Sequence, residues 1–286
     1  MNSVKTLFAV AFSISMISTS SYGSSAVHDY FAMQGPRGEK MVLSTQGTQN
    51  YTSLANMDLA PRGSAALTSS GDLATTGIKY IIHAASGAMM NSTDKTAPSL
   101  EGVRLSVINS IRIAEKEGIK KLAIPLIGGG IFLRSLNISK EELAYSIIQA
   151  ARSAKSSVQL VFVAYNASDS EAMQYALDKD SKAKAKTTTE GDWDWLIKIW
   201  KYILKTFASS SQNFAAKAEL VQGSIVDFKV HKAEAIVNAA NMEISFGGGI
   251  SGAIGQATNE SGYIDDAAGI LIKNYYRQNH IKWSAE

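Results

Sequence analysis

The sequence contains no cysteine and only four histidines among its 286 residues. Without cysteine the chain forms no disulfide, so its stability has to come from its apolar core. The histidines, at positions 28, 83, 231 and 280, show no metal-ligand spacing, and we expect neither a metal site nor a cofactor. His83 lies in an apolar run, and we interpret it as a core histidine whose hydrogen bonds are satisfied.

The chain also has little excess of positive over negative charge, with a formal net charge of only +3. That excess is too small to predict nucleic-acid binding. A hydrophobic content of 45% with 19% charged residues predicts a globular protein with a real core. The length allows one large domain or two small ones.

One short apolar run stands near the N-terminus, and no other stretch is long and apolar enough for a transmembrane helix. Lys5 precedes the run from Leu7 to Ile17, and small residues follow at 21–23 and 24–26. This is the pattern of a secretory signal peptide, and the run is too short to cross a bilayer core of about 30 Å comfortably. We therefore expect a signal peptide over residues 1–26 and a periplasmic or secreted protein; a membrane anchor is the alternative.

Strand and helix patterns alternate through residues 61–180, after an N-terminal extension over 27–60. The extension is polar and irregular except for a candidate strand at 40–45. Ser139 and Glu142 have the spacing of a helix capping box. The pattern predicts an α/β fold with a largely parallel sheet covered on both faces. Strands are expected within 64–70, 78–86, 121–127 and 158–166, and helices over 100–117, 139–154 and 168–177.

The segment from 178 to 216 interrupts this alternation, which resumes from 217 with strands expected over 218–223 and within 233–241 and a last helix over 270–279. Residues 178–192 have no apolar face, and we place a linker over 181–216 that contains an amphipathic helix at 193–207. That helix has two interpretations. It packs across the domain, or Trp193, Trp195 and Trp200 contact a membrane surface.

Two glycine runs each follow a buried strand. Gly128, Gly129 and Gly130 follow one, and Gly247, Gly248 and Gly249 precede a helix expected from about Ser251. Glycine lets a ligand approach the backbone, and free N–H groups at a helix start attract anions. Two such loops at strand ends could hold a diphosphate between them. Neither has the sequence of a P-loop or of a dinucleotide-binding fingerprint.

The stretch "VQGSIVDFKVHKAEAIVNAANMEISFGGGISGAIGQAT" resembles the opening half of a macrodomain, the ADP-ribose-binding fold. The stretches "PRGSAALTSSGDLATTGIKYIIHAASG", "GIKKLAIPLIGGGIFL" and "VQLVFVAYN" resemble its closing half. The resemblance implies a three-layer α/β/α mixed sheet. The closing half, 61–180, comes before the opening half, 217–286, and this order indicates a circular permutation. Two degenerate macrodomain copies are the competing interpretation.

The resemblance also implies roles for individual residues. Asn241 would face the distal ribose and, in an enzyme, would be the catalytic positioning residue; Tyr165 would stack on adenine. Asn238 is included in the site and expected to tie its loop backbone together. The remaining implied contacts form two phosphate loops and an adenine-side pair: Gly247, Gly248, Gly249, Ile250 and Ser251; Gly128, Gly129, Gly130, Ile131 and Phe132; and Ser224 with Ile225.

Three positions depart from the family pattern. Ser224 stands where the family usually has an Asp for the adenine amine, and Ser251 and Gly255 stand where hydrolytic members carry an Asp and a His. Asp265 and Asp266 are candidates for a replacement acid, but a helix start, where carboxylates complement the dipole, is the preferred interpretation. The departures favour binding over hydrolysis, since losing a general base typically forfeits about 10²–10⁴-fold in rate.

The sequence therefore predicts an exported protein that binds ADP-ribose, a related nucleotide diphosphate or an ADP-ribosylated protein. Whether it is an ADP-ribosyl hydrolase stays open at this point, as does its oligomeric state. The alternative function is a protein-interaction or membrane-surface module with a decayed nucleotide site.

Overall fold

The computed structural model describes residues 29–48, 58–87, 97–186 and 218–279. The predicted signal peptide and the tryptophan-containing helix lie outside these ranges. Within them, no helix is long and apolar enough to cross a membrane.

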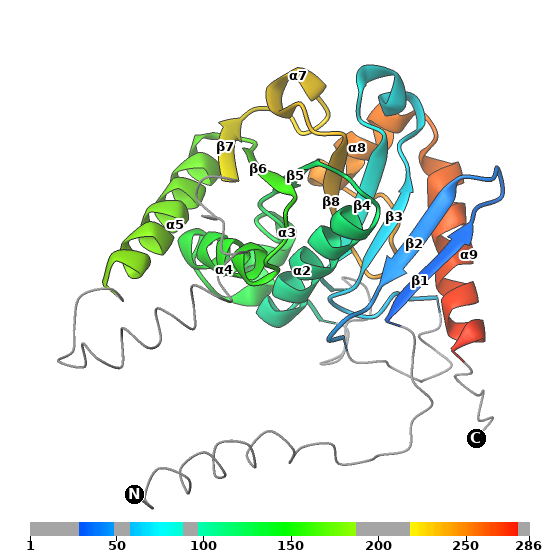
Figure 1. Ribbon diagram of the computed structural model, residues 1–286, viewed down its shortest axis with the longest axis horizontal. Coiled ribbons are helices and arrows are strands. Elements are labelled where there is room, and N and C mark those ends of the chain that lie inside the picture. Colours follow the sequence, from blue (N-terminus) through cyan, green and yellow to red (C-terminus); the bar gives the residue numbers. More distant parts are fainter. Residues whose placement is uncertain (1–28, 49–57, 88–96, 187–217, 280–286) are drawn as a thin grey trace, which may run out of the picture.

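A single mixed sheet of eight strands forms the centre of the molecule, in the order β1-β2-β3-β4-β8-β5-β6-β7. Strands β1 to β4 pair antiparallel, whereas β4, β8, β5, β6 and β7 run parallel. Figure 1 shows β8 between β4 and β5. The strands are β1 Tyr30–Gln34, β2 Lys40–Ser44, β3 Ala65–Ser69, β4 Tyr80–Ala85, β5 Lys121–Pro125, β6 Gln159–Ala164, β7 Ala218–Gln222 and β8 Ala235–Ala240.

Helices cover both faces of the sheet, which gives the predicted three layers. One face packs against α2, α4 and α5, and the other against α8 and α9. The helices are η2 Gly71–Thr76, α2 Leu100–Lys116, α3 Ile131–Leu136, α4 Lys140–Ser153, α5 Ala167–Lys186, α7 Phe228–His231, α8 Gly249–Thr258 and α9 Ser261–Gln278.

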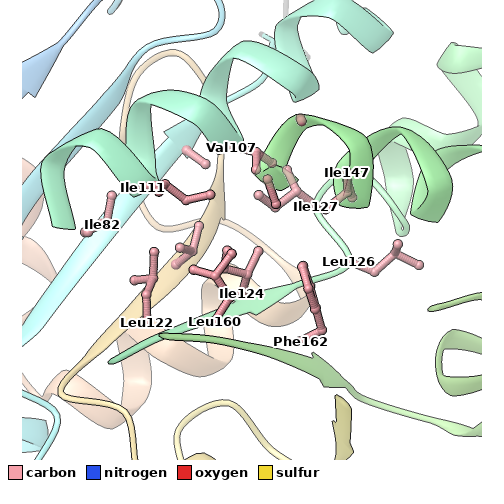
Figure 2. Close-up of a cluster of buried hydrophobic side chains, with 14 of the residues drawn as sticks. Ile82, Val107, Ile111, Leu122, Ile124, Leu126, Ile127, Ile147, Leu160 and Phe162 are labelled. Atoms are coloured by element: carbon pink, nitrogen blue, oxygen red, sulfur yellow. The ribbon is translucent and has the colours of Figure 1, made fainter. Parts of the chain in front are cut away.

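The alternation of side chains along the strands divides the core between the two faces. In β4, Ile82 faces the α2 layer while Ile81 faces the α8 layer. Figure 2 shows the larger cluster, in which Val107 and Ile111 of α2 lie over apolar side chains of β5 and β6. Leu126, at the edge of this cluster, lies just past the end of β5 and connects the core to the loop that follows.

Local signals place the start of α4 as predicted. The Ser139 hydroxyl accepts a hydrogen bond from the Glu142 N–H, and the Glu142 carboxylate accepts one from the Ser139 N–H. Both halves of the capping box are therefore present, and they satisfy two backbone N–H groups at the helix start.

The N-terminal extension and the closing helix differ from their predictions. The extension contributes a hairpin, β1–β2, which Figure 1 shows beside α9. Phe31 of this hairpin is buried against that helix.

Helix α5 continues to Lys186 rather than ending near 177. Its polar C-terminal half is anchored where Asp180 accepts hydrogen bonds from Gln149 and Arg152 of α4. Polar composition alone does not end a helix when such partners are present.

The last helix also differs, because α9 begins at Ser261, well before the predicted start at 270. Asp265 and Asp266 therefore lie inside the helix, and the first turn contains no acidic residue. The expectation that they sit at a helix start is wrong. Asp265 instead accepts a hydrogen bond from the Phe246 N–H at 3.0 Å, and burial raises the pKa of its carboxyl.

Candidate functional site

The candidate site lies at the edge where the parallel strands end. Because β8, β5, β6 and β7 run in the same direction, the residues that follow them meet at one edge of the sheet. These residues are Asn241 after β8, the 128–130 loop after β5, Tyr165 after β6 and Ser224 after β7. Segments separated by more than a hundred residues in sequence thus form one surface.

The glycines of the two loops leave open space above the backbone. A Cβ atom at Gly130, Gly247, Gly248 or Gly249 would meet no other atom within 4 Å. Gly249 has a φ of +62° at the first position of α8, a conformation that L side chains rarely adopt. Gly129 and Gly247 donate their N–H groups within the loops, to the Leu126 carbonyl and the Ser251 hydroxyl. The N–H groups of Gly248 and Gly249 have no partner among the described residues, and the α8 N-terminus adds its dipole.

Two cavities adjoin at these loops. One has a volume of about 380 Å³ and the other of about 190 Å³. They share Leu126, Gly130, Gly249 and Ile250 as lining residues, so the loops stand where the cavities meet. The larger cavity contains Gly129, Tyr165, Ser224 and Ile225, and the smaller contains Gly128, Phe132, Asn241, Gly247, Gly248 and Ser251.

The smaller cavity has a polar end around Asn241. The Asn241 side-chain NH₂ donates to the Glu243 carboxylate at 2.9 Å and to the Ser245 hydroxyl at 3.3 Å, while its carbonyl accepts from the Ser245 N–H. Ser251 accepts from the Gly247 N–H at 3.2 Å. The Asn241 and Ser251 side chains thus hold the loop that connects β8 to α8.

Phe246 explains the glycine at 255. A Cβ at Gly255 would lie 2.8 Å from the Phe246 ring, so the ring occupies the space that a side chain at 255 would need. The same ring packs against His83, with ring centroids 5.4 Å apart. A histidine at 255, which the resemblance associates with hydrolytic members, does not fit unless Phe246 moves.

Two of the predicted site residues are not seen to line the cavities. Asn238 is fully buried outside both cavities, and its NH₂ group donates to Nδ1 of His83 at 3.2 Å rather than to the loop backbone. Ile131 begins α3, and its side chain is outside the described set. The remaining thirteen predicted residues line one cavity or both.

His83 is a neutral core histidine, as the sequence indicates. Because the Asn238 NH₂ can only donate, Nδ1 of His83 accepts, and Nε2–H therefore donates to the Thr68 hydroxyl at 2.8 Å. Complete burial lowers the pKa of this histidine to about 3. The Asn238 carbonyl oxygen is buried and has no hydrogen-bond partner among the described residues.

Sequence reasoning missed two charged residues of the larger cavity. Lys140 and Asp169 form an ion pair of 2.7 Å, and among the described residues that line the two cavities only these two carry charge. Each stands in the first turn of a helix; α5 follows strand β6 of the site edge directly, whereas α4 follows α3. Only Asp169, four residues after Tyr165, therefore stands near a strand end where the sequence could have indicated it.

The comparison with protein families agrees with this architecture. The macro domain family model matches residues 44–142, a segment that contains the 128–130 loop but ends before β6. No curated protein matches the chain. The match supports the macrodomain family, and with the mixed sheet between helical layers it defines an α/β fold of the macrodomain type. Macro domains in general bind ADP-ribose, so the match suggests this ligand class.

Proposed function

We propose that the protein binds ADP-ribose, free or attached to a protein, across the two joined cavities. The observation that carries the proposal is the meeting of two open glycine loops between a cavity with an exposed tyrosine and a cavity with a polar asparagine. Such loops suit a diphosphate, because backbone N–H groups and the α8 dipole attract its charge. Adenine would then lie on Tyr165 and the distal ribose near Asn241.

Replacing Tyr165 tests this placement. Tyr165 is 73% exposed at the cavity, as expected for a ring that gains a stacking partner only with ligand. Stacking on a base is worth about 1–3 kcal/mol, so Tyr165→Ala should weaken ADP-ribose binding by roughly 5- to 150-fold in calorimetry. Tyr175→Ala is the control, since Tyr175 is 51% exposed on α5 and lines neither cavity. Absence of heat with the wild-type protein at millimolar ligand would instead favour the interaction module with a decayed site.

For catalysis, the side chains favour binding over hydrolysis. Ser251 is bonded to the loop backbone and cannot by itself deprotonate a water, and the Phe246 ring fills the space at Gly255. We expect no release of ADP-ribose from a modified protein, as followed by mass spectrometry. Release by the wild-type protein that Asn241→Ala abolishes would contradict this and assign Asn241 the positioning role.

The order of the two halves is best explained by circular permutation. Supporting this proposal, β7 and β8 of the later segment lie in the same sheet as the strands of the earlier one, with β8 between β4 and β5. A chain that runs from residue 217 to 286 and continues with 27 to 186 should keep the wild-type circular dichroism and ADP-ribose affinity. Failure of that chain to fold would count against permutation.

Export is proposed from the N-terminal sequence alone. Lys5, the apolar run and the small residues after it have the arrangement that signal peptidases cleave. N-terminal sequencing of protein recovered outside the cytosol should give a first residue after Gly23 or Ala26. Recovery of the intact chain in the cytosol would contradict export.

A further inference from the structure

The ion pair between Lys140 and Asp169 lies in the wall of the larger cavity, together with Tyr165 and Ser224. Lys140 is the first residue of α4, and the capping box of Ser139 fixes the position of that helix start. Asp169 is in the first turn of α5, where its N–H donates to the Asn166 side chain at 2.9 Å. The two side chains are 23% and 15% exposed, so the pair is largely withdrawn from water.

Holding α4 and α5 together does not account for the position of this pair. The same two helices are joined near α4's other end by Arg152 and Asp180, also at 2.7 Å. That second pair lines neither cavity. The two pairs thus join the same helices, and only one of them faces the space in which a nucleotide base is proposed to lie.

The ion pair of Lys140 and Asp169 does not use all of its hydrogen-bond donors and acceptors within the described residues. The Lys140 ammonium has three protons and donates to the Asp169 carboxylate and to the Ser168 hydroxyl, at 2.7 and 3.0 Å. One proton has no partner in the part of the chain that the structure describes, and neither does the second carboxylate oxygen of Asp169. The pair that lines the cavity therefore retains one donor and one acceptor.

We propose that Lys140 and Asp169 recognise the pairing edge of adenine. That edge presents an acceptor, N1, beside a donor, the 6-amino group, which matches one ammonium proton beside one carboxylate oxygen. The pair would supply the acidic contact that the family places at Ser224, a residue whose hydroxyl carries no charge. This inference rests on the proposed function, because it assumes that the base enters the larger cavity.

Comparing ADP-ribose with its 1,N6-etheno derivative tests the proposal by calorimetry. The etheno ring ties up N1 and the 6-amino group and leaves the diphosphate and both riboses unchanged. Because a site that hydrogen-bonds a base edge discriminates by about 1–3 kcal/mol, the wild-type protein should bind ADP-ribose roughly 5- to 150-fold more tightly than the etheno compound.

A double variant separates edge recognition from simple exclusion of a larger base. Lys140→Met with Asp169→Leu replaces the pair by apolar side chains of similar size, a change that proteins often tolerate. ADP-ribose affinity should fall to the level of the etheno compound, leaving a ratio within about twofold. Arg152→Met with Asp180→Leu is the matched control between the same helices and should keep the wild-type ratio.

The outcomes distinguish this inference from the proposed function. If the wild-type protein binds both compounds equally, or if the Lys140/Asp169 variant keeps the wild-type ratio, the inference is overturned while ADP-ribose binding stands. If the wild-type protein binds neither compound, the proposed function is overturned, and the inference with it.

Discussion

Gly248→Val should weaken ADP-ribose binding strongly without changing the stability of the fold. Gly248 lines the smaller cavity, and a Cβ atom added there would meet no protein atom within 4 Å. A valine side chain would therefore extend into the cavity, where the diphosphate is proposed to bind. Its φ of −86° and ψ of 178° are extended values that valine adopts without strain. Placing a side chain into a packed contact costs about 1–3 kcal/mol, which corresponds to roughly 5- to 150-fold in affinity measured by calorimetry.

A second glycine provides the control for this prediction. Gly262 in α9 is equally open, with no atom within 4 Å of an added Cβ, but it lines neither cavity. Gly262→Val should therefore leave ADP-ribose affinity unchanged. Wild-type affinity in Gly248→Val would show that the ligand does not approach the 247–249 loop, and the proposed placement of the diphosphate would be wrong.

Acid should destabilise the protein through His83. The unfolded chain binds a proton at this residue near pH 6.5, whereas burial keeps the folded protein from doing so until about pH 3. Protons therefore favour the unfolded state between these two values. The free energy of unfolding should fall by up to about 1.4 kcal/mol for each pH unit below 6.5, and by about 5 kcal/mol in all.

Urea denaturation between pH 7 and pH 4.5 measures this slope. His83→Gln should flatten it, because glutamine does not titrate. A residual slope is expected from His231, whose pKa is also lowered by burial. Asp29, whose pKa is lowered in the folded protein, adds to the slope only near the lower end of this range, where the unfolded chain's carboxyl begins to bind protons. Equal slopes in the wild-type protein and in His83→Gln would contradict the assignment of the acid effect to His83.

Much of the fold follows from local pattern. The alternating apolar runs predict β3 to β8, and the Ser139–Glu142 spacing predicts the start of α4, because each depends on residues a few positions apart. The end of α5 and the start of α9 differ from the local pattern, because contacts with distant residues also determine where a helix begins and ends. Asp180 stabilises the polar half of α5 through Gln149 and Arg152, some thirty residues earlier in the chain.

The candidate site likewise has residues that the sequence predicts and residues that it does not. Tyr165 and Asn241 stand directly after strands, and each glycine loop lies between a strand and the helix that follows it. The sequence therefore indicates that they gather at one edge of a parallel sheet. Lys140 and Asp169 carry no comparable motif. Their meeting depends on how α4 packs beside α5. An acidic residue such as Asp169 in the first turn of a helix usually only complements the dipole, and Lys140, a cation at a helix N-terminus, does not complement it.

By itself, the sequence determined the α/β class, the strands that are followed by glycine loops, and the position of His83 in the core. These features depend on side-chain period and on residue type, which local sequence contains. Tertiary structure alone decided that β8 enters the sheet between β4 and β5, that the Phe246 ring occupies the space at Gly255, and that one ion pair faces the cavity. A buried parallel strand is apolar on both faces, so its hydrophobic pattern does not specify which strands lie beside it. Close packing between segments that are distant in sequence specifies these neighbours.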